Sequence, residues 1–118
     1  MPVELSVETD RTTTKAGVNG SSIPLAFVSV SFDGRKQSGT SNVTTTYNST
    51  TRNYEITLAG VKFNRTQYTA IACISGWNGR PLFINTDDSV DGKLLVDMRD
   101  THGALGQADF QVAVFQAQ

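Results

Sequence analysis

The stretch Leu25–Phe32, with the sequence LAFVSVSF, decides the fold class of this chain because its apolar residues recur with a period of two. One side of an extended backbone carries Phe27 with two serines, and the other carries Val28, Val30 and Phe32. This alternation is typical of a β-strand, whereas a helix needs apolar residues three and four positions apart. An Asp-Gly pair follows, which is a strong turn signal. The stretch therefore predicts a strand that ends in a tight turn.

The segment Ala108–Phe115, with the sequence ADFQVAVF, repeats the pattern near the other end of the chain. Phe110, Val112 and Val114 share one face, and we expect them in the hydrophobic core. The opposite face of this segment also carries apolar residues, as do both faces of the first strand. A two-layer sandwich buries only one face of each sheet, so a second apolar face needs cover from elsewhere.

Five further stretches are predicted as strands: Asn42–Tyr47, Tyr54–Leu58, Gln67–Ser75, Pro81–Asn85 and Lys93–Met98. The third of these is an almost continuous apolar run, which favours a central strand covered on both faces. Turns rich in Gly, Asn and Asp separate the strands, and no helical stripe of ten residues occurs. Seven or eight short strands of this kind predict an all-β fold, an antiparallel β-sandwich of the jelly-roll type.

The chain has 118 residues, which fits one domain. We expect the sandwich to occupy residues 23–118. Residues 1–22 begin with alternating apolar residues and continue as a polar, threonine-rich segment, so we expect an extended N-terminal arm there.

The net charge is −1, and only 18% of the residues are charged, so nothing predicts a nucleic-acid partner. Residues 35–80 are nevertheless net basic and residues 81–118 net acidic. The apolar stretches are too short to span a bilayer, and we expect neither a signal peptide in this chain nor membrane insertion.

Candidate catalytic and metal-binding residues are sparse. Cys73 is the one cysteine, and its apolar neighbours predict a buried, unreactive thiol. His102, the one histidine, is expected in a solvated turn. Asp87, Asp88 and Asp91 resemble a calcium loop in composition but lack the EF-hand spacing, so a surface turn is expected, with a weak divalent-cation site as the alternative. We therefore predict no enzymatic activity, no metal and no cofactor.

A glycine-flanked loop carries the candidate ligand-binding residues Trp77, Asn78 and Arg80. An indole can stack on the apolar face of a sugar ring, while an amide and a guanidinium supply hydrogen bonds. Asn85 and Asp87, beyond the next short strand, are expected on the same rim. The alternative is that Trp77 covers a sheet edge or packs between subunits.

Several short motifs occur in a characteristic order: Ala26-Phe27-Val28, Phe32-Asp33-Gly34, Asn53-Tyr54-Glu55-Ile56, and the run Gly92–Gly103 leading to Phe110–Phe115. This order resembles the jelly-roll tips of bacteriophage tail fibres and bacterial trimeric adhesins. It is similar, more distantly, to the complement/tumour-necrosis-factor-like heads. The chain departs from the latter at Arg52, where many relatives have glycine two residues before the tyrosine.

The resemblance covers residues 23–116 and implies a homotrimer at the distal end of a fibre. Such a tip faces the exterior of a virion or of a bacterial cell and binds a cell-surface receptor, often a glycan. The N-terminal arm would then be the end of the fibre stalk, and a threefold partner would cover the second apolar faces. Two alternatives stay open, which are a structural virion or capsid jelly roll used for assembly and a monomeric carbohydrate-binding module.

Overall fold

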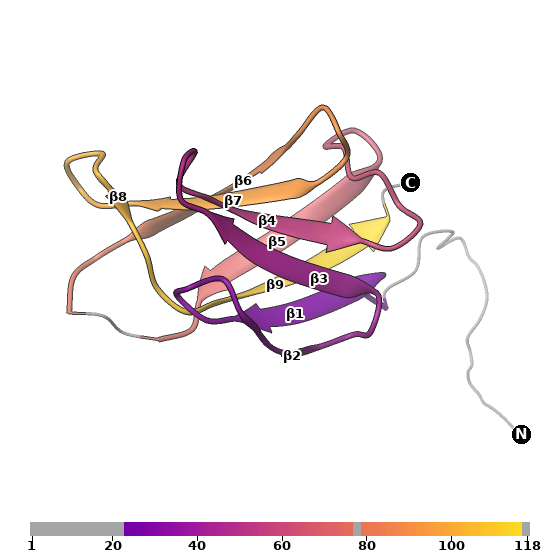
Figure 1. Ribbon diagram of the computed structural model, residues 1–118, viewed down its shortest axis with the longest axis horizontal. Coiled ribbons are helices and arrows are strands. Elements are labelled where there is room, and N and C mark those ends of the chain that lie inside the picture. Colours follow the sequence, from indigo (N-terminus) through magenta and orange to yellow (C-terminus); the bar gives the residue numbers. More distant parts are fainter. Residues whose placement is uncertain (1–22, 77–78, 117–118) are drawn as a thin grey trace, which may run out of the picture.

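The computed structural model describes residues 23–76 and 79–116, and it contains two antiparallel sheets packed face to face (Figure 1). The all-β sandwich predicted from the sequence is therefore confirmed. The predicted N-terminal arm, residues 1–22, lies outside the described residues. No helix in the described part of the chain has the length and apolar character needed to cross a bilayer.

Nine strands are present in these ranges, two of which are too short to have been expected from periodicity. The four-stranded sheet has the order β2 (Lys36–Gly39), β1 (Ala26–Val30), β9 (Phe110–Gln116), β5 (Tyr68–Ile74). The five-stranded sheet has the order β3 (Val43–Asn48), β4 (Asn53–Leu58), β7 (Leu94–Arg99), β6 (Phe83–Asp88), and β8 (Leu105–Gly106) also pairs with β7. Every pairing between these strands is antiparallel.

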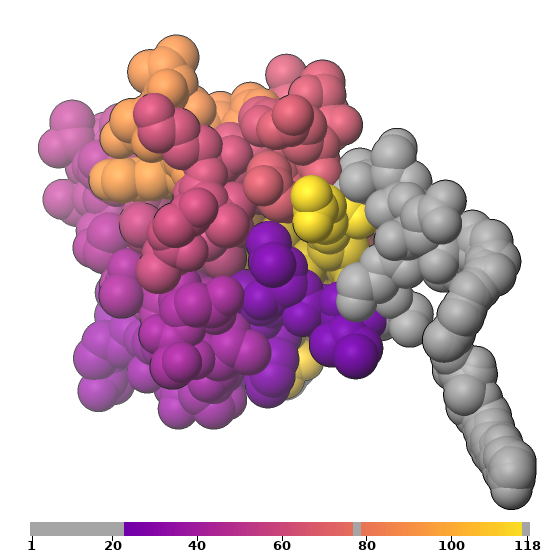
Figure 2. Space-filling view, turned by 90° about the vertical axis from the view of Figure 1, so that its right-hand side faces the viewer, coloured from indigo at the N-terminus to yellow at the C-terminus, as the bar shows by residue number. Residues whose placement is uncertain are grey.

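The first and last described strands close the four-stranded sheet together. β9 lies between β1 and β5, and the start of β1 lies beside the end of β9 (Figure 2). The Leu25 amide extends this pairing by donating to the Val114 carbonyl at 2.7 Å. Segments from opposite ends of the described chain are thus joined by backbone hydrogen bonds.

The core lies between the inner faces of the two sheets. Phe110, Val112 and Val114 are buried there, which confirms the prediction for the closing strand. Tyr54 is completely buried and its ring packs edge-on against Phe110, with 4.8 Å between ring centroids. Burial raises the pKa of Tyr54 to about 12 because the phenolate would lose its hydration. Its hydroxyl donates to the Phe32 carbonyl at 2.6 Å and so links β4 to the turn that follows β1.

The prediction that Gln67–Ser75 forms a central, doubly covered strand is wrong. β5 is an edge of the four-stranded sheet among the described residues, and its side chains alternate between partly buried and exposed. Ile71 and Cys73 belong to the exposed set, so the expectation of a buried thiol is also wrong. The apolar run belongs to an edge strand whose outer face is apolar and exposed in the single chain. The sequence pattern does not distinguish such a strand from a central strand that is covered on both faces.

β1 ends earlier than its alternation suggests. The register with β2 shifts between Ser29 and Val30, and the backbone then turns so that Ser31 points inward. Phe32 is consequently 57% exposed, although Val28 and Val30 on the expected face are buried. A bulge of this kind changes which side of the sheet the following residues occupy.

Arg52 adopts a left-handed backbone conformation with φ of 63°, and it is the one residue other than glycine to do so in the described chain. It lies in the tight turn between β3 and β4, where its amide donates to the Asn48 carbonyl at 2.7 Å. A side chain with a Cβ atom is strained in this region, which glycine occupies freely. Many of the complement/tumour-necrosis-factor-like heads that the sequence distantly resembles have glycine at this position.

Candidate functional site

The residues predicted for a ligand-binding loop do not all fall in the described chain. Trp77 and Asn78 lie outside it. Arg80 follows, and its Nη1 atom forms an ion pair with Asp100 Oδ2 at 3.3 Å. Its guanidinium lies so close to Gly106 that a Cβ atom at this glycine would be 2.7 Å from Nη2. Arg80 is thus held against the turn that follows β7.

Asn85 and Asp87 lie on β6, on the outer face of the five-stranded sheet, and not on a loop rim. The Asn85 Nδ2 atom donates to Asp97 Oδ1 on the neighbouring strand at 3.0 Å. Asp87 Oδ1 forms an ion pair with Arg65 Nη1 at 3.5 Å. The structure therefore brings Asn85 and Asp87 together on one face and leaves Arg80 apart from them.

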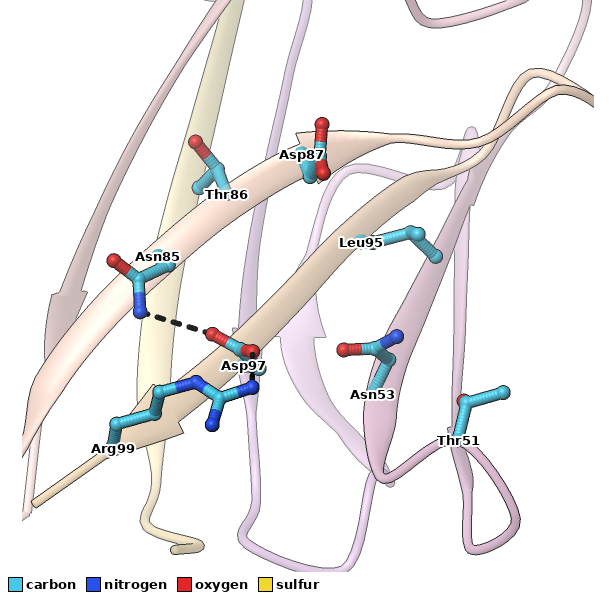
Figure 3. A pocket seen from close by; sticks show the side chains of 8 residues that line it. All are labelled: Thr51, Asn53, Asn85, Thr86, Asp87, Leu95, Asp97 and Arg99. Carbon is cyan, nitrogen blue, oxygen red and sulfur yellow. Dashed lines mark hydrogen bonds and ion pairs between the residues drawn. The ribbon is translucent and has the colours of Figure 1, made fainter. Parts of the chain in front are cut away.

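The two residues belong to a groove that we call the polar groove (Figure 3). Its lining comes from the β3–β4 loop, β4, β6 and β7: Thr51, Asn53, Asn85, Thr86, Asp87, Leu95, Asp97 and Arg99. The side chains of Asn53, Asn85, Leu95 and Asp97 lie over the sheet in the close-up view. Most of the lining stands on strands that are hydrogen-bonded to one another.

Asp97 and Arg99 form the electrostatic centre of the polar groove. Arg99 Nη2 lies 3.4 Å from Asp97 Oδ2, and Arg99 Nη1 donates to the Gly103 carbonyl at 3.0 Å. The guanidinium is thereby fixed between the turn and the groove. The side chain of Asn53 makes no hydrogen bond within the described chain. Its carboxamide group is therefore available to a ligand.

The outer face of the four-stranded sheet is of the opposite kind. We call it the apolar face, and it consists of Phe27, Ile71, Cys73, Ala113 and Phe115. Phe27 and Ile71 are both in register with Ala113 on the strand between them, so the three form one row across the sheet. Phe27 is 51% exposed and Ile71 is 61% exposed, and with Cys73 and Ala113 they line a shallow depression.

His102 lies in an exposed turn, in the place that the sequence predicted. The preceding Asp100 carboxylate accepts hydrogen bonds from the backbone amides of His102 and Ala104, at 2.9 and 3.0 Å. The Ala104 and His102 amides, with the nearby Arg80, lower the pKa of Asp100. Asp100 therefore stabilises the turn, because its carboxylate accepts hydrogen bonds from two backbone amides of that turn.

The three aspartates with the composition of a calcium loop have partners of their own. Asp87 and Asp88 both contact Arg65, and Asp91 accepts a hydrogen bond from Ser89. No group of three potential metal ligands occurs within residues 23–76 and 79–116. The ion pairs of Arg65 connect the net basic residues 35–80 with the net acidic residues 81–118. The ion pair between Arg80 and Asp100 does the same.

Comparisons with models of protein families, with curated proteins and with solved structures gave no match to this chain. The family expected from the short motifs therefore stays a prediction. The function has to be argued from the two outer faces of the sandwich.

Sequence reasoning did not anticipate Thr51, Asn53, Asp97 and Arg99 as site residues. The alternation in β7 does place Asp97 and Arg99 on its outer side, which is a signal that the sequence carries. Their meeting with Asn53 depends on the pairing of β4 with β7, which are distant in the chain. A polar residue facing outward is ordinary on a sheet, and only the assembled face reveals a groove.

Proposed function

We propose that this chain is a non-enzymatic receptor-binding domain, the tip of a trimeric fibre exposed on a virion or a bacterial surface. The observation that carries the proposal is the apolar face, because a sandwich in water normally presents polar side chains on its outer sheets. Contiguous exposed apolar surface on a soluble domain is typical of an association site.

Further copies of the same chain are the proposed occupants of the apolar face. Three strands contribute apolar side chains in register, and the surrounding outer positions are Ser29, Ser38 and Gln111, which carry no charge. Uncharged surroundings favour burial, since an interface core is depleted of charged residues. A closed threefold ring is also what the resemblance to trimeric fibre tips implies.

The mass of the full chain in solution tests this proposal. Light scattering at micromolar concentration should give about three times 12.7 kDa. Ile71→Glu should yield a folded monomer, because a carboxylate at the centre of an apolar interface loses its hydration. Thr57→Glu is the matched control on the other sheet, where the exposed Thr57 belongs to the outer face of β4, and it should stay trimeric.

A monomeric wild-type protein would contradict the trimer and favour the reading as a monomeric carbohydrate-binding module. A trimer that binds no bacterial or host cells, tested across a cell panel with a fluorescent label, would instead favour a structural virion component. Trimer formation together with saturable cell binding is the expected result.

A further inference from the structure

The polar groove has the chemistry of a ligand site, and its hydrogen-bonding groups are already positioned. Asn85 and Asp97 are directly opposite each other on β6 and β7, and their side chains are joined by a hydrogen bond. Arg99 is held from two sides, by Asp97 and by the Gly103 carbonyl. Groups that are fixed before a ligand arrives lose little conformational freedom when it binds.

The groove has unused hydrogen-bonding capacity of both kinds. The Asn53 amide has no partner in the described chain and offers two donor hydrogens and an acceptor oxygen. The Thr51 hydroxyl group at the rim likewise makes no side-chain hydrogen bond within the described residues. A carboxylate has about four acceptor positions, so Asp97 can accept further bonds beside those from Asn85 and Arg99. Mixed donors and acceptors suit hydroxyl groups, which do both.

Apolar contacts accompany the polar ones. The half-buried side chain of Leu95 lines the groove on the β6–β7 side. Phe83 is 61% exposed and directly opposite Arg99 in the β6–β7 register, so it continues the same face one row beyond Asn85 and Asp97. An exposed aromatic ring beside a polar row is the arrangement that receives the C–H face of a sugar ring.

The charged side chains that line the polar groove disfavour an anionic ligand. Asp87 and Asp97 are the acidic members and Arg99 is the one basic member. Arg99 already faces a carboxylate at 3.4 Å, and Arg65 outside the lining compensates Asp87. A phosphate, sulfate or sialic acid group would therefore meet carboxylates without a free cation.

From these observations we infer that the polar groove binds a neutral oligosaccharide, with Asn53 and Asp97 as its principal hydrogen-bonding residues and Phe83 as its apolar platform. This inference rests on the proposed receptor-binding function and names the ligand class and its site. It differs from the loop site at Trp77 that the sequence suggested, because the ligand contacts come from β4, β6 and β7.

The full chain, applied to an array of immobilised neutral oligosaccharides with sialylated counterparts, provides the test. The wild type should bind neutral members. Calorimetry with the strongest neutral binder should then show affinity reduced about tenfold or more by Asn53→Ala and by Asp97→Asn, since each removes a hydrogen bond made at a preorganised position. Phe83→Ala should weaken binding similarly through loss of ring contact.

Two variants serve as controls, and each should bind like the wild type. Thr57→Ala changes an exposed residue on the same face of β4 outside the groove lining. Trp77→Ala changes the loop that the sequence suggested. Thermal unfolding and light scattering accompany every variant, so that loss of binding is read only from proteins that retain the wild-type fold and mass.

Binding lost through Trp77→Ala but kept in Asn53→Ala and Asp97→Asn would overturn the groove as the site. Selective binding of sialylated members, or binding of no array member at all, would overturn the ligand class. If the protein nevertheless forms trimers and binds cells, the proposed receptor-binding function survives that failure. If cell binding is absent too, the proposed function fails with it.

Discussion

The two sheets of this sandwich have similar inner faces and opposite outer faces. On the five-stranded sheet the outward side chains satisfy one another: Glu55 accepts from Asn48 at 2.9 Å and from Lys93 at 3.0 Å, while Asp97 is held by Asn85 and Arg99. On the four-stranded sheet the central outward row is Phe27, Ala113 and Ile71. The outer face of the five-stranded sheet is mostly polar, with Phe83 exposed on β6, whereas the central outer row of the four-stranded sheet is apolar.

The difference teaches that the two sides of an alternating strand have to be interpreted separately. The inner side reports on the core, and the outer side reports on what the sheet surface contacts. The inner sides of the four central strands, which are β1, β4, β7 and β9, are buried and apolar in both sheets. The outer side is free to be polar, so an apolar outer side indicates contact with another surface. On this basis we propose that the four-stranded sheet serves association and the five-stranded sheet binds a ligand.

The largest expected effect comes from the core on which both faces depend. Phe110 is fully buried and contacts Tyr54, so Phe110→Ala should lower the free energy of unfolding by about 3–5 kcal/mol per chain. Denaturant titration measures this directly. His102→Ala, in an exposed turn, is the control and should change stability by less than about 0.5 kcal/mol. Similar small effects in both variants would mean that the closing strand is wrongly placed.

Cys73 lets the apolar face be compared with the polar one by chemical labelling. If other copies cover the apolar face, a maleimide should modify Cys73 about 30-fold more slowly in the assembled protein than in the Ile71→Glu monomer, a difference of about 2 kcal/mol in activation free energy. A cysteine placed at Asn53 in a Cys73→Ser background is the control, and its labelling should not depend on assembly. Equal rates for Cys73 in both proteins would contradict the proposed interface.

The Tyr54 hydroxyl joins β4 of one sheet to the turn after β1 of the other, so its removal should have a measurable effect. Tyr54→Phe removes the 2.6 Å bond to the Phe32 carbonyl, which still accepts from Gln107 at 2.9 Å. The expected loss is about 1 kcal/mol in the free energy of unfolding at pH 7, measured by denaturant titration. A loss above about 3 kcal/mol would point to repacking of the core around the ring.

The raised pKa of Tyr54 adds a prediction at alkaline pH. The unfolded chain releases this proton near pH 10, whereas the folded chain keeps it until about pH 12. Between these values the folded state binds more protons, so stability falls as the pH rises, by up to about 1.4 kcal/mol per pH unit. Below pH 10 the group contributes no slope. The free energy of unfolding of Tyr54→Phe should decline less steeply between pH 10 and pH 12 than that of the wild type. Parallel declines in the two proteins would contradict a raised pKa of Tyr54.

The smallest expected effect lies in the turn that borders the polar groove. Arg52→Gly relieves a left-handed conformation that costs about 1–2 kcal/mol, and part of this gain is offset by the greater freedom of glycine in the unfolded chain. We expect a net stabilisation of about 0.5 kcal/mol. Arg52→Ala keeps the Cβ atom and should bring no gain, so stabilisation by both variants would identify the arginine side chain itself as unfavourable.

The sequence predicted the fold class and the inner residues because burial follows the local period. Phe110, Val112 and Val114 are confirmed on that basis alone. It did not place Cys73 correctly, because whether an apolar strand is central or lies at an edge depends on which distant strand pairs with it. The bulge at Ser29 and Val30 likewise shifted Phe32 outward without any local signal in the alternation.

The candidate site could be predicted less well than the core. Asn85 and Asp87 were named as rim residues from their position after the loop, and they do share a groove. Asn53 and Asp97 complete it only through the pairing of β4 with β7, which the sequence does not encode locally. A groove formed from several strands is a property of their register, whereas a loop motif such as the one at Trp77 is visible in a single stretch.

The position of β9 between β1 and β5 has a consequence for biosynthesis. A ribosome delivers β1 and its neighbour β2 early, but the other neighbour of β1 in the sheet, β9, is translated only after almost the whole domain. The hairpins β1–β2, β3–β4 and β6–β7 can form as they emerge, but the four-stranded sheet cannot be completed without β9. The native four-stranded sheet therefore has to await translation of β9, and a chain that ends before Phe110 lacks the strand that joins β1 to β5.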